Sequence, residues 1–324
     1  NGNSATGQEA LTANITGSYN TANGYLALER NVSGDYNTAN GFQSLMLNTI
    51  GSYNAANGTY SLISNSSGNY NTANGTYALG SNATGNYNTA SGYASLLGNT
   101  IGKSNVAIGS YTLNNNSGRS YLVAVGDSAL FSLNGGPGRS TAVGSKALAL
   151  TTNGSDNTAI GFESLKNNTG GVNNTALGTY ASGDNTTGGS NTAIGYQAMG
   201  SNTTAGNNVS VGSQALYNNT TYSNLVAVGY QALYSNAALY NTAVGYRAMR
   251  NNNSGHDNTA LGYDALFNNT SGYNNTAVGP VALTSNTTGY NNTGIGVWAL
   301  RNNTTGQQNT ALGHQSLDNN TGGH

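Results

Sequence analysis

The stretch Asn241-Thr242-Ala243-Val244-Gly245-Tyr246-Arg247-Ala248-Met249 decides the fold, because the chain repeats it with small variations along its whole length. We number every copy from its central glycine, so that Gly245 is position zero. The sequence holds nineteen copies, and the spacing is 17 residues in all but two intervals. The exceptions are 18 residues after Gly126 and 16 residues after Gly229. A fixed, short period is typical of a solenoid, in which each repeat forms one coil stacked on the last.

The apolar residues of the repeat occupy fixed positions. Position +4 is Leu or Met in every copy except the one with Ser182, and the residue before it is small. Because alternate residues of a strand point to opposite faces, Thr242 and Val244 should share one face while Ala243 lies on the other. We expect the +4 side chains to form a continuous buried row, including Leu216, Leu233, Leu266 and Leu283.

The remaining residues of each copy are turn formers. The glycine at position zero permits a bend or a close approach of two backbones, and Tyr246–Met249 is predicted to be a second short strand. Asn, Gly and Thr, as in residues 268–274, tolerate left-handed backbone and bond local amides. The fold class is therefore predicted to be all-β, a parallel β-solenoid (β-roll) of nineteen coils of about 17 residues.

Two other conformations are less consistent with these residues. Asn, Thr and Gly fill positions where a helix needs Ala, Leu, Glu or Lys. Low charge and abundant Asn and Gly also occur in disordered segments, but a disordered chain has no use for an aliphatic residue at every +4 position.

The chain is predicted to be one continuous solenoid with two segments. In residues 1–100 position −1 is Asn or Ser in the five coils from Gly24 to Gly92, and a Tyr precedes it by four residues. In residues 101–324 position −1 is aliphatic and the continuous Tyr row ends. We therefore expect two cross-sections that change near residue 100, with the tyrosines supplying the apolar surface that Val or Ile supplies later. The 18-residue coil contains Gly135-Gly136-Pro137-Gly138, which is predicted to bulge outward.

Composition excludes several classes of function. Only 6% of residues are charged, against about 25% in a typical globular chain, and the net charge is −1. We therefore expect no nucleic-acid partner. No apolar run is long enough to cross a membrane, so we expect no membrane insertion. The chain has no cysteine, which excludes disulfides and thiol chemistry.

No constellation for catalysis, cofactor binding or metal binding is visible. The three histidines, His256, His314 and His324, fall at different repeat positions. The acidic residues are scattered singly, whereas calcium-binding β-rolls repeat an Asp in every turn. We therefore predict no enzyme activity, no cofactor and no metal.

One chemical signal does recur, the Asn-x-Ser/Thr sequon at position +7. On an exposed turn of a secreted protein each such Asn is a candidate glycosylation site. We expect these side chains to point outward; the alternative is an inward ladder in which each amide bonds its neighbours along the stack. The candidates are Asn14, Asn31, Asn65, Asn82, Asn185, Asn202, Asn219, Asn252, Asn269, Asn286 and Asn303.

The phrase Asn-Thr-Ala-Val-Gly-Tyr-x-Ala-Leu resembles the head repeats of YadA-like trimeric autotransporter adhesins and, more closely, repeats of bacteriophage tail-fibre proteins. The resemblance covers Ser4 to Leu317. It implies a left-handed parallel β-roll in which three chains form one fibre. The period here is longer than is usual in the YadA-like head, and the coils before Ile108 lack the aliphatic residue before the glycine.

These observations predict a structural extracellular fibre or filament segment with an adhesive role, on a cell or virion surface. The alternative is a module that binds a periodic ligand such as polysaccharide or ice through its Thr row. The expected partners are copies of the chain itself, as a homotrimer or an end-to-end filament, and glycans. Self-assembly is expected because the core is thin, Ala243 and Ala248 suggest a face pressed against a neighbour, and neither end carries a recognisable capping element.

Overall fold

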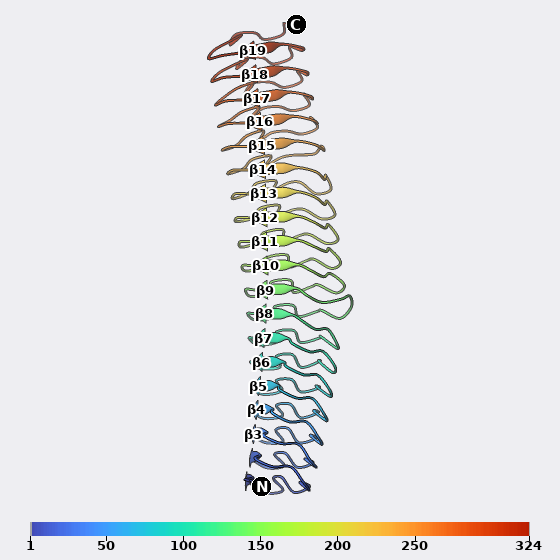
Figure 1. Ribbon diagram of the computed structural model, residues 1–324. Coiled ribbons are helices and arrows are strands. Elements are labelled where there is room, and N and C mark those ends of the chain that lie inside the picture. The colour runs from blue at the N-terminus through green and yellow to red at the C-terminus, as the bar shows by residue number, and fades with distance from the viewer. Residues whose placement is uncertain (1, 324) are drawn as a thin grey trace. The chain divides into compact units, whose positions relative to one another are not determined.

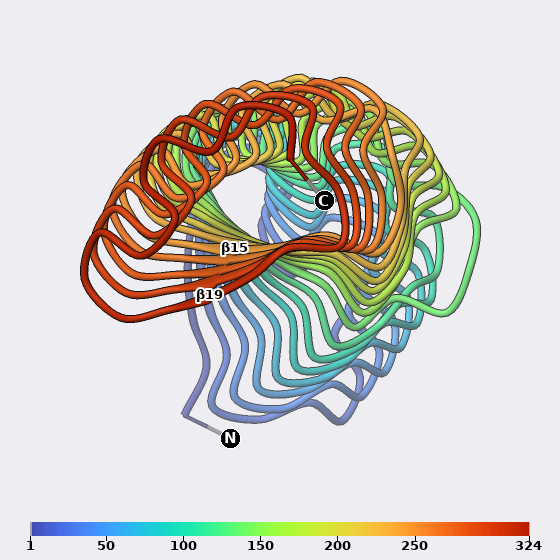
Figure 2. The same cartoon turned by 90° about the horizontal axis from the view of Figure 1, so that it is seen from above.

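The computed structural model describes residues 2–323, which contain nineteen parallel strands and no helix. They form a β-solenoid, as the repeat predicts. The coils divide into two compact units, residues 1–163 and 164–324. Within each unit the strands stack one per coil (Figure 1). Seen from above, they lie along one side of the coil while turns make up the rest (Figure 2).

Every strand has three residues and ends just before a zero-position glycine. The first unit contains β1 (Ser4–Thr6), β2 (Thr21–Asn23), β3 (Thr38–Asn40), β4 (Ala55–Asn57), β5 (Thr72–Asn74), β6 (Thr89–Ser91), β7 (Val106–Ile108), β8 (Val123–Val125), β9 (Thr141–Val143) and β10 (Thr158–Ile160). The second contains β11 (Thr175–Leu177), β12 (Thr192–Ile194), β13 (Val209–Val211), β14 (Val226–Val228), β15 (Thr242–Val244), β16 (Thr259–Leu261), β17 (Thr276–Val278), β18 (Thr293–Ile295) and β19 (Thr310–Leu312).

Within each unit consecutive strands pair in register, so equivalent repeat positions lie side by side. Thr242 pairs with Thr259 and Ala243 with Ala260. The 16-residue coil keeps this register, because Val226 of β14 pairs with Thr242 of β15. The 18-residue coil keeps it too, with Val123 of β8 opposite Thr141 of β9. The extra residue is absorbed at 134–138, whose loop bulges from the coil edge as predicted (Figure 2).

The prediction of which strand residue points inward is confirmed. Ala243 is fully buried, while Thr242 and Val244 on either side are partly exposed. The +4 row is also buried as predicted: Leu216, Leu233, Leu266 and Leu283 are all at 0% exposure. Ala248 is likewise buried. The small residues Ala243 and Ala248 therefore line the interior of their own coil, and they are not evidence for a second chain.

The predicted second strand, Tyr246–Met249, is wrong: these residues form turns. Positions +2 and +4 take left-handed backbone, with φ of 51° at both Arg247 and Met249. Their amides consequently bond in opposite directions along the stack, from Arg247 to the carbonyl of Tyr230 at 2.8 Å and from Met249 to that of Ala265 at 2.9 Å. A left-handed non-glycine residue costs about 1–2 kcal/mol. Burial of a Leu or Met side chain, which stabilises by about 1.5–3 kcal/mol, offsets that cost.

The zero-position glycine is required by a close approach of two backbones. Gly195 has φ of 129°, and a Cβ there would lie 2.7 Å from the carbonyl oxygen of Gly212 in the next coil. No real Cβ tolerates this contact, and few L-residues adopt this φ. Glycine at this position therefore both allows the predicted bend of the chain and lets the backbones of adjacent coils come into contact.

The change of sequence near residue 100 is a change of surface. The early tyrosines Tyr19, Tyr36, Tyr53, Tyr70 and Tyr87 are 48–60% exposed and stack face to face with ring centroids 4.9–5.0 Å apart. Asn40 and Asn57 at position −1 also lie on the outer surface, where Asn40 Nδ2 donates to Asn57 Oδ1 at 2.8 Å. The later aliphatic row is outward too, with Ile108 43% exposed. The −2 Ala and +4 Leu rows of the core continue on both sides of the change.

Candidate functional site

The eleven sequon asparagines do not point outward, so that prediction is wrong. All except Asn14 are at 0% exposure, and Asn14, in the first coil, is partly exposed. Their side chains form the inward ladder that was the alternative. The amide nitrogen that would carry a glycan is used in hydrogen bonds, so glycosylation in the folded coil would require those bonds to break. The correction applies to the predicted outward orientation of Asn14, Asn31, Asn65, Asn82, Asn185, Asn202, Asn219, Asn252, Asn269, Asn286 and Asn303.

Asn65 shows the geometry of this +7 ladder. Its Nδ2 donates to Asn48 Oδ1 of the preceding coil at 2.8 Å and to the Gly68 carbonyl of its own coil at 3.0 Å. Its Oδ1 accepts from Asn82 Nδ2 of the following coil at 2.8 Å. The same donor direction runs unbroken from Asn116 back to Asn14. A buried amide is thereby satisfied without water.

The sequon pattern is a by-product of this ladder. Asn48, Asn99 and Asn168 occupy the same buried position, yet none has Ser or Thr two residues later. The ladder requires Asn at +7, whereas the Thr that follows belongs to the turn. The sequon at Asn115 differs, because its side chain is exposed.

A second asparagine row, at position −4, was missed by the sequence reasoning. It is Asn in all copies except those with Leu122, Ser140 and Leu225, and this regularity was the available signal. The backbone N–H of Asn71 donates to Asn54 Oδ1 at 3.0 Å, and the Asn54 side chain donates to the Gly68 carbonyl at 2.8 Å. Gly68 therefore accepts from both rows, because Asn65 donates to the same oxygen.

A glycine at +10 links the two rows in most coils, and at Gly68 there is no room for a side chain. A Cβ on Gly68 would collide with the Gly85 carbonyl and with Asn65 Oδ1, and would lie 2.8 Å from Asn82 Nδ2. The asparagine rows and this glycine row thus form one polar strip inside each coil. Most of its side-chain groups bond to protein, so the strip holds adjacent coils together.

The strip is interrupted at the coils of unusual length. In the first unit Leu122 and Leu133 replace both asparagines of one coil, and Arg119 stands where the +10 glycine is expected. Arg119 is 7% exposed; its Nη2 donates to the Thr152 carbonyl at 3.3 Å, while Nη1 has no hydrogen-bond partner. Burial lowers the pKa of Arg119. In the second unit the Oδ1 atoms of Asn202 and Asn219 lack partners near the 16-residue coil.

The titratable groups form isolated pairs. The Asp264 carboxylate raises the pKa of Arg247, to which Arg247 Nε donates at 2.9 Å. Hydrogen bonds from Arg139 and Ser155 lower the pKa of Asp156. In residues 2–323 no three His, Cys, Asp or Glu side chains gather as a metal site would require. The same residues contain no helix able to cross a membrane.

The histidine that the sequence placed beside an acid lies on the surface. His256 Nδ1 and Asp257 Oδ2 are 2.7 Å apart, and the imidazole stacks on Tyr273 with centroids 5.2 Å apart. His314 lies against Trp298 at 5.7 Å, and His324 lies outside the described residues. The described histidines therefore stay apart, at separate positions of the repeat.

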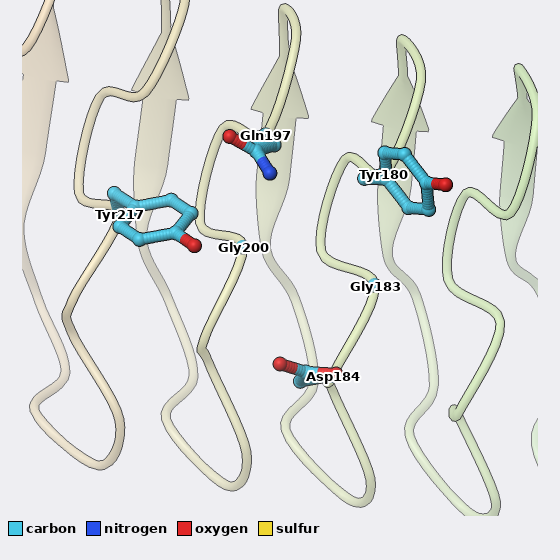
Figure 3. A pocket seen from close by; sticks show the side chains of 6 residues that line it. All are labelled: Tyr180, Gly183, Asp184, Gln197, Gly200 and Tyr217. Atoms are coloured by element: carbon cyan, nitrogen blue, oxygen red, sulfur yellow. The ribbon is translucent and has the colours of Figure 1, made fainter.

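Two hollows interrupt the surface of the second unit. One, of about 140 Å³, is lined by Tyr180, Gly183, Asp184, Gln197, Gly200 and Tyr217 (Figure 3). The other, of about 300 Å³, is formed mainly by Tyr222, Leu239 and Tyr240 beside the His256–Asp257 pair. Neither contains residues that the sequence reasoning had selected as a site.

Comparison with protein-family models and with curated proteins finds no match for this chain.

Proposed function

We propose that this chain is a structural segment of an extracellular fibre, in which copies of the chain pack against one another. The observation that carries the proposal is a pair of exposed apolar columns in the second unit, one at the last residue of the strands and one directly after the glycine that follows each strand. At position −1, Leu177 and Leu261 are 44% and 47% exposed, and at position +1, Tyr246 and Tyr263 are 45% and 49% exposed. Tyr230, Tyr246 and Tyr263 come from successive coils and stack on one another. Neighbouring exposed apolar side chains of this kind are typical of protein–protein contact surfaces.

The interior supports a mechanical role for each unit. Buried amides and backbone groups bond to the coil before and the coil after, so a force along the stack acts on many parallel hydrogen bonds at once. Stability in such a repeat is approximately a sum of terms between nearest neighbours. This arrangement resists extension without any specific ligand.

Sedimentation velocity and light scattering of the purified chain test the proposal. We expect self-association that grows with concentration and weakens in Leu261→Lys, which places a charge in the apolar column. Thr305→Lys adds the same charge at an exposed turn and should leave association unchanged. A monodisperse monomer at all concentrations, or equal behaviour of the two variants, would count against the proposal.

A second candidate function is recognition of a periodic ligand, such as polysaccharide or ice, by the outer strand face. The favouring observation is that Thr242, Thr259 and Thr276 stand at paired positions on this face, about 4.8 Å apart from coil to coil. Val209 and Val226 interrupt the row. A thermal hysteresis assay tests the ice-binding form of this candidate, because a purely structural fibre segment should give none.

A further inference from the structure

The smaller hollow arises from two successive glycines at position +5. Other copies carry bulky side chains there, such as Ile63, Leu97 and Phe267. A single +5 glycine leaves no hollow, because the Leu97 side chain covers Gly80: a Cβ on Gly80 would lie 2.7 Å from Leu97 Cδ1. Gly183 and Gly200 lie in adjacent coils. The ring of Tyr217 covers Gly200, since a Cβ on Gly200 would lie 2.8 Å from Tyr217 Cε2. Gly183 faces Gly200, which has no side chain to cover it.

The hollow has an aromatic side chain at each end and polar groups between them. Tyr180 and Tyr217 come from coils two apart, and Gln197 extends from the coil between them (Figure 3). Asp184 lies at the lower edge, below the two glycines (Figure 3). The floor is bare backbone, so a ligand can approach closely.

Gln197 presents a hydrogen-bond donor to this space. It is the first member of a glutamine row in which Gln231 Nε2 donates to Gln214 Oε1 at 2.9 Å, and Gln214 Nε2 donates to Gln197 Oε1 at 3.1 Å. Its acceptor is therefore occupied, and its Nε2 is directed toward the glycines (Figure 3). Asp184 offers the complementary acceptor, since a carboxylate has room for bonds beyond the one from Asn167 Nδ2 at 3.1 Å.

We propose that this hollow binds one ring of a neutral sugar. A sugar hydroxyl both donates and accepts, so it can use the Gln197 amide and the Asp184 carboxylate together, while the apolar C–H face of the ring lies against Tyr217. The Asp184 charge disfavours acidic sugars. An ammonium ligand would be attracted by the Asp184 carboxylate and by the two tyrosines, but it could not accept the hydrogen bond that Gln197 Nε2 donates, whereas a sugar hydroxyl can. This inference does not depend on the proposed structural role.

Saturation-transfer NMR on the intact chain tests the site. The probes are the methyl glycosides of glucose, galactose and mannose, and tetramethylammonium serves as the cation probe. We expect at least one glycoside to bind with a Kd of about 1 mM, as is reasonable for a shallow site that contacts a single ring. Tyr217→Leu and Gln197→Met should each weaken this binding by about tenfold. Leu is acceptable at +5, as Leu97 shows.

Two control variants match these changes at the same repeat positions away from the hollow. Phe267→Leu removes a ring from the +5 row, and Gln43→Met removes an amide from position +2. Both should retain the affinity of the parent chain, and circular dichroism should be the same for all four variants. Absence of saturation transfer to every glycoside, unchanged affinity in Tyr217→Leu, or binding of tetramethylammonium in place of the glycosides would each overturn the proposal. Self-association measured in parallel reports on the structural role separately.

Discussion

Replacing Asn65 with Asp is a direct test of the internal asparagine ladder. The change keeps the shape of the side chain but removes both hydrogens that Asn65 donates, to Asn48 Oδ1 at 2.8 Å and to the Gly68 carbonyl at 3.0 Å. An oxygen would then face two acceptors inside a fully buried site. Gly68 would keep its bond from Asn54, whereas Asn48 Oδ1 would lose its donor.

The expected loss of stability follows from these contacts. One orphaned buried acceptor costs about 1–3 kcal/mol, and an uncompensated buried charge raises the total to about 3–5 kcal/mol. Burial should also raise the pKa of the introduced carboxyl above its unfolded value of about 3.9. The folded variant then binds a proton more tightly than the unfolded variant does, so its deficit should be smallest in acid and grow as pH rises.

Thermal unfolding followed by circular dichroism measures this effect. We expect Asn65→Asp to melt about 10 °C below the parent chain at pH 8, with a smaller difference at pH 4. Asn115→Asp, at an exposed sequon, changes the same charge and should alter stability by no more than about 0.5 kcal/mol. If the two variants melt alike, or if the Asn65→Asp deficit does not depend on pH, the ladder is not what stabilises the coil.

Three further predictions concern departures from the repeat. Ser182→Leu should stabilise the chain by about 1–3 kcal/mol, because the buried Ser182 Oγ has no hydrogen-bond partner and every other residue at position +4 is Leu or Met. The urea midpoint of unfolding should therefore rise, and a lower midpoint would contradict the prediction. Arg119→Met should leave the melting temperature unchanged or raise it, since burial lowers the pKa of Arg119 and Nη1 is unpaired; a marked fall would show that the charge is needed. Asp156→Asn should speed trypsin cleavage after Arg139, whose Nη2 bonds Asp156 at 3.0 Å. Because that bond lowers the pKa of Asp156, the Arg139–Asp156 ion pair of the parent chain should persist above a pH of about 4 and be lost as the pH falls further. If Asp156→Asn is cleaved at the same rate as the parent chain, the ion pair does not protect this loop.

The sequence predicted those features that depend on side-chain size and alternation. Ala243 and Leu216 belong to rows in which an apolar residue recurs once in every coil. Such a regular apolar position is predicted to be buried, because burial removes apolar surface from water. The failure at Tyr246–Met249 has a physical cause. A left-handed Met249 is disfavoured locally, and only contact with the neighbouring coils offsets that cost, so propensity alone favours a strand.

The asparagines were placed outward for a similar reason. Burying a single amide without hydrogen-bond partners costs free energy, so considering Asn65 alone predicts that its side chain faces solvent. A stack changes that result, since each amide finds its partners in identical residues above and below. The replacement of the Tyr row by an aliphatic residue at position −1 near residue 100 concerns the outer surface, because both rows are exposed.

The two irregular coils show how the asparagine ladder responds to a change in the 17-residue period. A ladder bond needs its two asparagines close together in adjacent coils. The 16-residue interval still meets this condition, because Asn252 Nδ2 donates to Asn236 Oδ1 at 2.8 Å. Leu122 and Leu133 change together in one coil beside the 18-residue interval, and replacing both polar members by apolar ones avoids an unsatisfied group. Near the 16-residue coil Asn202 and Asn219 stay polar, and their Oδ1 atoms are left without partners. The break in the ladder therefore lies across a 17-residue interval, where Asn219 Nδ2 donates to the Tyr222 carbonyl at 2.9 Å and Asn202 Oδ1 is left without a donor. A constant period is not sufficient for the ladder, because the turn that follows each asparagine must also keep its shape.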